Sequence, residues 1–300
     1  KMTLAGFFKR RLIRLHPMII MGMIIGAIGF YFAASPALFP GISSVPAWKM
    51  LLVMVIGFTL IPVPTSLDIR GWTEMHPLNG PAWSLFFEYI GNILYAFVLR
   101  RLPTIILALL ALGAGAALVH LAVTSEHGDL IGGWSLEPAQ FRIGITRLLY
   151  PFFAGLLLSR IIKKPGHIPH AFLWCSLLVI AILSAPWLGG GQLWLNGLYD
   201  SLSVILLFPL IIYIGACGTV KGKTADALCR FLGDISYPLY IIHYPLIYIF
   251  TAWVVDNNIP VAKAWPMALL VLAASLGIAW ACLKLYDIPV RKWLMKRWIR

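Results

Sequence analysis

The sequence predicts an all-α fold, a polytopic membrane helix bundle, from three observations. Hydrophobic residues make up 60% of the 300 residues and charged residues only 12%, whereas a soluble globular chain carries about 25% charge. The mean hydropathy of +0.87 and the 13% aromatic content exclude a disordered chain. The basic residues behind the net charge of +13 stand in short clusters between apolar runs. That distribution is typical of membrane proteins rather than of proteins that bind nucleic acid.

Nine apolar segments approach the length of about 20 residues that a helix needs to cross about 30 Å of hydrocarbon. We expect helices because open strands would leave backbone groups without hydrogen bonds in lipid. No gap between the segments has the length of a soluble domain, so residues 1–300 are expected to form a single membrane domain. The segments are 17–34, 48–64, 82–99, 104–123, 147–162, 171–187, 201–217, 235–254 and 265–286.

The connections between these segments alternate in charge from residue 65 onward. The basic ones are 1–14, 100–101, 160–164, 221–230 and 291–300, and the neutral or acidic ones are 65–80, 124–142, 188–200 and 255–264. The positive-inside rule therefore predicts an external segment 65–80 and a cytoplasmic C-terminus. Because segment 1–14 should also be cytoplasmic, one early apolar segment should not cross. We assign 48–64 to a re-entrant or interfacial segment, which leaves eight crossings.

One carboxylate lies within a predicted span, where an ionisable group is costly and so indicates a function. Glu88 is about two turns into the helix that begins near Pro81, and Ser84 lies one turn earlier on the same face. Trp83 suits the membrane interface. Glu88 fits a general acid or base, or an anchor for a sugar hydroxyl. A structural partner for a buried arginine or histidine explains the residue equally well.

A histidine lies at a similar depth in a later span. His243 follows Tyr240 by three residues, so the two share a helix face. A neutral imidazole accepts a proton near pH 7, which fits a general base. A histidine that is hydrogen-bonded between packed helices is the competing interpretation. Glu88 and His243 together would also fit a proton relay in a transporter.

The N-terminal basic cluster contains Arg11 and Arg14, which are three residues apart on one helix face. Two such arginines can bind a phosphate group in a bidentate manner. The alternative is a juxtamembrane stretch that contacts anionic lipid. No Cys-x-x-Cys motif or Cys/His ligand spacing is present, so no metal site is predicted.

Four motifs occur in the order found in one protein family. Residues 8–17 contain an Arg-x-x-Arg pair followed by a proline, and residues 83–89 contain Trp-Ser-Leu-x-x-Glu. Residues 236–245 read Ser-Tyr-x-x-Tyr-x-x-His-x-Pro, and residues 286–293 contain Asp-x-Pro-x-Arg where the family has Glu-x-Pro-x-Arg. The chain resembles the acyltransferase type 3 membrane proteins over almost its whole length.

The resemblance implies an enzyme that O-acylates an envelope or exported glycan. The donor would be cytoplasmic acyl-CoA, with no further cofactor, and the location would be the bacterial inner (plasma) membrane. Arg11 and Arg14 would bind the CoA phosphates or help in acyl transfer. The transfer site would be lined by the remaining motif residues, Trp83, Ser84, Glu88, Tyr240 and His243.

The sequence departs from the family pattern at one point. The family carries an arginine followed eleven residues later by histidine in its first membrane helix, and that histidine is its favoured catalytic base. None of the seven histidines here has an arginine eleven positions before it. We therefore expect one or two family helices to lie upstream of Lys1. The alternative is a truncated, non-catalytic homologue.

Overall fold

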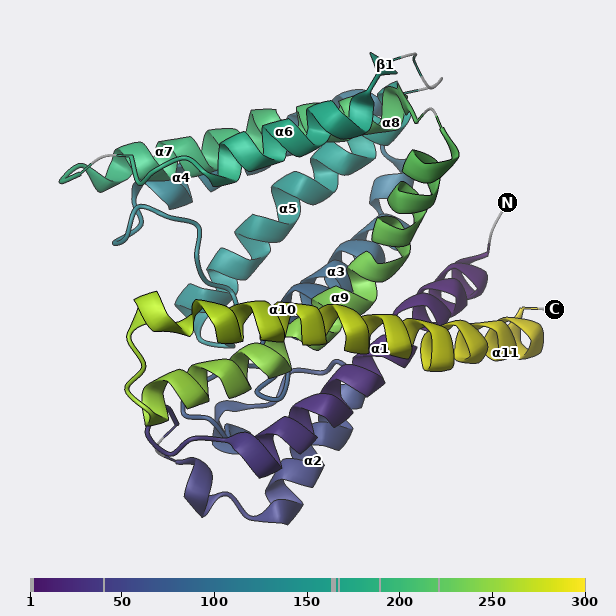
Figure 1. The fold of residues 1–300 in the computed structure, drawn as a ribbon. Coiled ribbons are helices and arrows are strands. Elements are labelled where there is room, and N and C mark those ends of the chain that lie inside the picture. The colour runs from purple at the N-terminus through teal and green to yellow at the C-terminus, as the bar shows by residue number, and fades with distance from the viewer. Residues whose placement is uncertain are drawn as a thin grey trace. The chain divides into compact units, whose positions relative to one another are not determined.

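A computed structural model shows a chain built almost entirely of helices, which confirms the all-α prediction (Figure 1). The structure describes residues 3–39, 41–162, 166, 168–188, 190–220 and 222–299. Five cations used to predict the orientation, Lys1, Lys163, Lys164, Lys221 and Arg300, lie outside the described residues.

The larger part of each predicted apolar segment is helical. The α-helices are α1 (Leu4–Ala33), α2 (Ala47–Phe58), α3 (Ala82–Phe97), α4 (Thr104–Val123), α5 (Pro138–Ile161), α6 (Ala171–Leu183), α7 (Leu193–Leu202), α8 (Phe208–Cys217), α9 (Lys223–Asp256), α10 (Val261–Cys282) and α11 (Ile288–Trp298). Shorter elements are the 3₁₀ turns η1 (Ile42–Ser44), η2 (Thr65–Leu67) and η3 (Leu99–Arg101), the π-helical turns η4 (Ser203–Leu207) and η5 (Leu283–Asp287), and the strands β1 (Ile168–Pro169) and β2 (Gly218–Thr219).

Among the described residues, six helices are long and apolar enough to cross a membrane. They are Leu4–Ala33, Thr104–Val123, Pro138–Ile161, Leu193–Cys217, Lys223–Asp256 and Val261–Trp298. α2 has 12 residues and rises only about 18 Å; that 48–64 does not cross remains a prediction. α3 and α6 have 16 and 13 residues. The count of eight crossings remains a prediction.

The basic N-terminal cluster is part of a helix rather than a connection. α1 begins at Leu4, where the Thr3 Oγ1 accepts a hydrogen bond from the Gly6 amide at 3.1 Å. A threonine at this position satisfies one of the free amides of the first turn. Arg11 and Arg14 therefore lie on the same continuous helix as the apolar segment that follows them.

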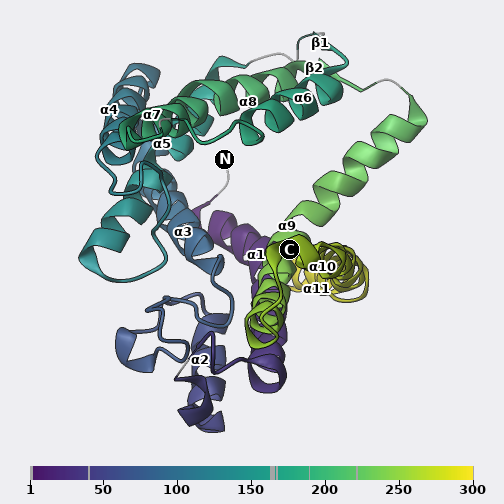
Figure 2. The ribbon, with the colours of Figure 1, turned by 60° about the vertical axis from the view of Figure 1, so that its left-hand side comes forward.

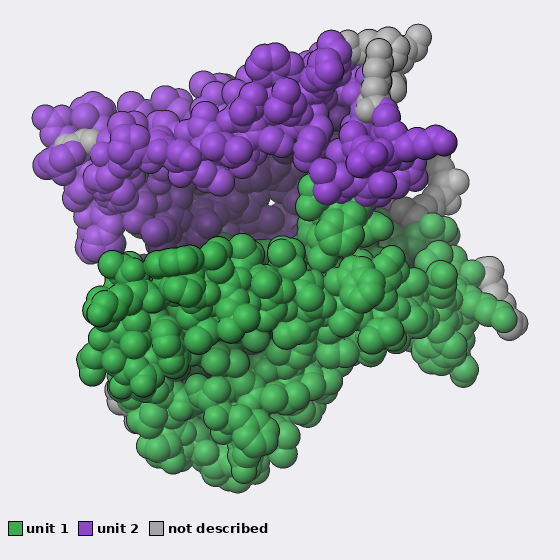
Figure 3. Space-filling model, viewed as in Figure 1, with its two compact units in different colours: residues 1–86, 134–136, 231–300 green, residues 87–133, 137–230 purple. Residues whose placement is uncertain are grey.

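The chain divides into two compact units, which Figure 3 colours separately. Unit 1 comprises residues 1–86, 134–136 and 231–300, and unit 2 comprises residues 87–133 and 137–230. Two of the divisions fall within α3 and α9, and the other two fall on either side of residues 134–136. Each unit is described by itself below.

Unit 1 is organised around α1, whose glycines allow close packing. A Cβ atom at Gly22 would overlap the Ile241 side chain of α9, and one at Gly26 would overlap the Leu78 carbonyl oxygen. Next to these glycines, Met18, Ile19 and Met23 are almost completely buried. Segment 60–81 therefore packs directly against the backbone of α1.

Replacement of Gly26 should show how tight this packing is. Gly26→Ala should destabilise unit 1 by about 1–3 kcal/mol, because the carbonyl oxygen of Leu78 is backbone and cannot turn aside. The matched control is Gly277→Ala in α10, where a Cβ meets nothing within 4 Å. Thermal unfolding in detergent measures the effect. Equal melting temperatures for the two variants would contradict the close approach.

Unit 2 is a bundle in which α4 packs on α5 and α7, and α6 lies beside α8 (Figures 1 and 2). Strands β1 and β2 form a short parallel pair, with Ile168 opposite Gly218 and Pro169 opposite Thr219. The π-helical turn η4 joins α7 to α8, and the Tyr150 hydroxyl of α5 donates a hydrogen bond to its Ile205 carbonyl at 2.7 Å.

Candidate functional site

Two of the predicted motifs meet within unit 1. The Ser84 Oγ lies 2.5 Å from the Tyr240 hydroxyl oxygen, which links the first turn of α3 to α9. The Tyr240 hydroxyl also donates to the Pro81 carbonyl at 2.8 Å. The Pro81 carbonyl also accepts a hydrogen bond from the Ser84 amide at 3.1 Å, so it serves donors from both helices. The residues of the Trp-Ser-Leu and Ser-Tyr-x-x-Tyr motifs thus form one hydrogen-bonded junction.

A second bond fixes the same junction one residue further along α9. The Asn79 Nδ2 donates to the Ile241 carbonyl at 2.9 Å, and Asn79 is only 1% exposed. Trp83 is half-buried beside Ser84 in the first turn of α3. The start of α3 is therefore held against the middle of α9 by polar bonds as well as by packing.

His243 lies one helix turn after Tyr240 and is half-buried. Its Nδ1 is 3.0 Å from the Leu239 carbonyl oxygen, and its ring centroid is 6.0 Å from that of Tyr240 and 5.8 Å from that of Tyr244. A carbonyl oxygen can only accept a hydrogen bond, so Nδ1 carries the proton in this contact. With its proton on Nδ1, the neutral form of the ring presents Nε2 as a proton acceptor, which is the form that a general base requires.

The two predicted phosphate-binding arginines lie near the start of α1. Arg14 is exposed and Arg11 is half-exposed, with the Arg11 guanidinium 5.7 Å from the Phe7 ring centroid. The Tyr237 hydroxyl of α9 donates to the Leu15 carbonyl at 2.7 Å. This bond ties the arginine-bearing part of α1 to the same helix that carries Tyr240 and His243.

Glu88 belongs to unit 2, because the division between the units falls just before Phe87. The residue is half-buried in the middle of α3, and its carbonyl accepts a bond from the Asn92 Nδ2 at 2.9 Å. The other six predicted residues, Arg11, Arg14, Trp83, Ser84, Tyr240 and His243, belong to unit 1. The catalytic role of Glu88 remains a prediction.

A buried polar cluster in segment 60–81 was not predicted. Arg70 is 2% exposed, and its guanidinium lies 3.7 Å from the Tyr248 ring centroid and 4.7 Å from that of Phe39. Its Nε donates to the Pro77 carbonyl. The hydroxyl of Tyr248 bonds the Glu74 carboxylate, with its oxygen 2.7 and 2.8 Å from the two carboxylate oxygens. The cluster joins the segment to α9.

Glu74 is 5% exposed. Burial raises the pKa of Glu74 to about 7, against the lowering effects of the Tyr248 hydrogen bond and the Arg70 charge. At neutral pH this carboxyl is therefore divided between its charged and uncharged forms.

The pKa of His76 is shifted in the direction that also favours the uncharged form, which for a histidine is downward. Burial lowers its pKa to about 4, so the ring is neutral at physiological pH. The His76 Nε2 lies 3.2 Å from the Leu60 carbonyl oxygen, whereas Nδ1 is buried without a hydrogen-bond partner. A neutral ring that donates through Nε2 fits both observations.

The sequence contains one signal for this cluster. Four polar residues, Arg70, Glu74, His76 and Asn79, lie within ten positions between two apolar segments. The charge pattern of segment 65–80 predicts only its orientation, as an external connection, and carries no information on burial. A solvated connection would leave those side chains exposed, whereas all four are at most 5% exposed.

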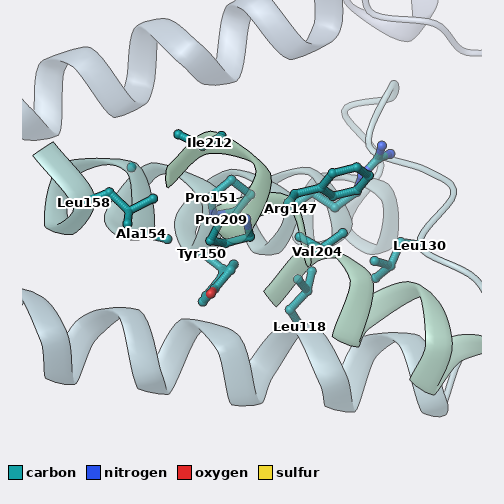
Figure 4. Close-up of a pocket in the computed structure, with 12 residues that line it drawn as sticks. Leu118, Leu130, Arg147, Tyr150, Pro151, Ala154, Leu158, Val204, Pro209 and Ile212 are labelled. Atoms are coloured by element: carbon teal, nitrogen blue, oxygen red, sulfur yellow. The ribbon is translucent and has the colours of Figure 1, made fainter. Parts of the chain in front are cut away.

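A cavity of about 340 Å³ lies within unit 2 between α4, α5 and α8 (Figure 4). It is mostly apolar, and Arg147 and Tyr150 of α5 bring the polar groups to its wall. None of the residues predicted for the site lines this cavity. Among the described residues, no cluster of three or more His, Cys, Asp or Glu side chains could hold a metal ion.

Comparison with known proteins identifies the family of the chain. The model of the acyltransferase 3 family, described as an acyltransferase domain, matches residues 1–284. The chain belongs to this family. As a member with six helices of spanning length among the residues that the structure describes, it is an integral membrane protein.

One curated relative is the acyltransferase MdmB of Streptomyces mycarofaciens. It is 23% identical over 264 residues, which cover 82% of this chain and 62% of that protein. The chain thus spans less than two thirds of the length of this acyltransferase. No solved structure matches the chain.

Proposed function

We propose that the chain is the membrane domain of an O-acyltransferase. The enzyme would transfer an acetyl or other short acyl group from acyl-CoA to a hydroxyl of a cell-envelope or exported glycan. The observation that carries the proposal is the junction of Ser84 with Tyr240, beside the His243 ring. Family membership supports acyl transfer, and the acyl-CoA donor and glycan acceptor are our inference from the motifs. We place the protein in the bacterial inner membrane with its C-terminus in the cytoplasm.

The proposed reaction is a direct transfer. The Nε2 of His243 takes the proton of the acceptor hydroxyl while the hydroxyl oxygen bonds to the thioester carbonyl carbon. The tetrahedral oxyanion is stabilised by an arginine or by the Tyr240 hydroxyl. When the carbon–sulfur bond breaks, the proton passes from the imidazolium to the leaving CoA thiolate. Ester and free CoA are the products, so protons and charge balance without a cofactor.

Substitution of His243 tests the base. His243→Gln should lower kcat by about 10²–10⁴-fold, because glutamine cannot accept the proton, and should leave acyl-CoA binding unchanged. The assay is acceptor-dependent CoA release by purified protein in liposomes, with His120→Gln as a control outside the junction. An unchanged kcat would exclude His243 as the base. Solute flux without CoA release would support the transporter alternative, and acyl-CoA binding without CoA release would support a non-catalytic homologue.

Substitution of the arginine pair tests donor binding. Arg11→Ala/Arg14→Ala should raise the Kd for acyl-CoA by about tenfold or more, because hydrogen bonds between charged partners contribute about 1.5–3 kcal/mol each. The matched control is Arg100→Ala/Arg101→Ala, which removes two exposed cations elsewhere. Equilibrium binding in detergent measures both. An equal loss of affinity in the two double variants would show general charge attraction instead of a specific phosphate site.

A further inference from the structure

An apolar groove runs between α1 and α11, which are neighbours in unit 1. It encloses a cavity of about 400 Å³, lined from α1 by Leu12, His16 and Ile20 and from α11 by Val290, Leu294 and Trp298. The lining is almost entirely hydrocarbon. A volume in this range is typical of sites for small amphiphilic ligands.

Two cations stand at one end of this groove. Lys9 precedes Leu12 by three residues and Arg297 follows Leu294 by three, so each lies one helix turn from a groove residue. The Arg297 guanidinium lies 5.7 Å from the centroid of the Trp293 ring. The Lys9 Nζ is 3.5 Å from the Trp298 carbonyl oxygen, where the two helix ends meet. Both side chains are exposed. The groove therefore has an apolar body and a cationic mouth.

The neutralising charge has to come from outside these helices. Neither α1 nor α11 contains an aspartate or glutamate. The neighbouring Asp287 carboxylate is paired with Arg291 at 2.8 Å and is 1% exposed. Among the described residues neither Lys9 nor Arg297 forms an ion pair, so an anionic group bound at the mouth would gain two positive charges at the protein surface.

The groove is distinct from the arginine pair proposed to bind acyl-CoA. Arg11 and Arg14 are two and five residues from Lys9 on α1, and residues at those separations do not share a helix face. Hence the two interpretations of the basic N-terminal cluster, phosphate donor and anionic lipid, apply to different sides of one helix.

We propose that the groove between α1 and α11 binds an anionic phospholipid of the surrounding bilayer. Its acyl chain lies along Leu12, Ile20 and Leu294, and its phosphate lies between Lys9 and Arg297. A zwitterionic lipid has the same acyl chains but carries its own cation, so it gains less at the mouth.

The test is titration of the detergent-purified chain with phosphatidylglycerol or phosphatidylcholine, followed by native mass spectrometry. Wild-type protein should retain phosphatidylglycerol with an affinity about tenfold higher. Lys9→Gln/Arg297→Gln should abolish this preference. The matched control is Lys292→Gln/Lys296→Gln, whose exposed cations lie on other faces of α11, and it should keep the preference.

Three outcomes would overturn the proposal: equal binding of the two lipids by wild-type protein, an equal loss in both double variants, or a dimer that Leu294→Trp dissociates. The last would show a second copy in the groove. As a positive test of the apolar body, Leu294→Trp should lower retention of both lipids. Acyl-CoA binding should be unchanged in Lys9→Gln/Arg297→Gln, so failure of this proposal and failure of the donor site are separate results.

Discussion

Replacement of Arg70 by methionine should destabilise unit 1 by about 3–5 kcal/mol, because an unsatisfied buried acceptor costs about 1–3 kcal/mol and a desolvated cation–π contact contributes about 2 kcal/mol. Methionine fills much of the arginine volume but cannot donate to the Pro77 carbonyl. It also loses the contact with the Tyr248 and Phe39 rings, and it leaves the Glu74 carboxylate without a nearby cation. Thermal and chemical unfolding in detergent measure the loss.

Two further variants separate the contributions to this loss. Arg70→Lys keeps the charge but lacks the planar guanidinium, so an intermediate loss is expected. Glu74→Gln added to Arg70→Met should recover part of the stability, because the uncompensated acid is removed. Arg142→Met, at an exposed site of α5, is the matched control. If Arg70→Met melted like this control, the cluster would have no role in stability.

Glu74→Gln should stabilise the protein above pH 7 by about 3 kcal/mol and change how stability depends on pH. The pKa of Glu74 is raised from 4.5 to about 7 in the folded protein. Between those values the folded state holds more protons than the unfolded chain, so the free energy of unfolding falls as pH rises. A difference of about 2.5 pH units corresponds to about 3 kcal/mol. Glutamine remains able to accept the Tyr248 hydrogen bond.

The shifted pKa of His76 changes the free energy of unfolding with pH in the opposite direction. Its pKa is lowered from 6.5 to about 4, so between those values the unfolded chain holds more protons and the free energy of unfolding rises with pH. The two effects should nearly cancel between about pH 4.5 and 6.5. Wild-type stability should therefore be flat there, whereas Glu74→Gln should become more stable from about pH 4 to 6.5.

Chemical unfolding at half-unit steps from pH 4 to 8 checks this pair of slopes. Glu126→Gln, at an exposed position, should reproduce the wild-type profile and so serves as the control. A Glu74→Gln profile parallel to that of the wild type would contradict the raised pKa of Glu74.

The all-α fold was predictable because apolar runs of spanning length have one stable backbone arrangement in lipid. The helix ends were less predictable. α1 begins at Leu4 and α11 ends at Trp298, beyond the apolar segments, because charged residues continue a helix readily once it is capped. Hydropathy identifies the apolar span but does not identify the charged turns that extend the helix beyond it.

Contacts of the candidate site were predictable where they join residues one helix turn apart. Tyr240 and His243 share a turn of α9, as their three-residue separation requires. The bond from Ser84 to Tyr240 joins residues 156 positions apart, and no local pattern encodes such a pairing. The buried cluster of Arg70 and Glu74 could not be predicted for the same reason, because their partner Tyr248 lies far away in the sequence, on α9.

The glycines of α1 also determine which part of that helix can move. Sliding or rotation of the stretch around Gly22 and Gly26 would force its backbone into Ile241 or Leu78. Pro17 interrupts the hydrogen-bond ladder of α1 between this stretch and the turns that carry the cations. We expect larger thermal motion of the α1 backbone in those turns than around Gly26. Amide exchange should be fast there and slow around Gly26.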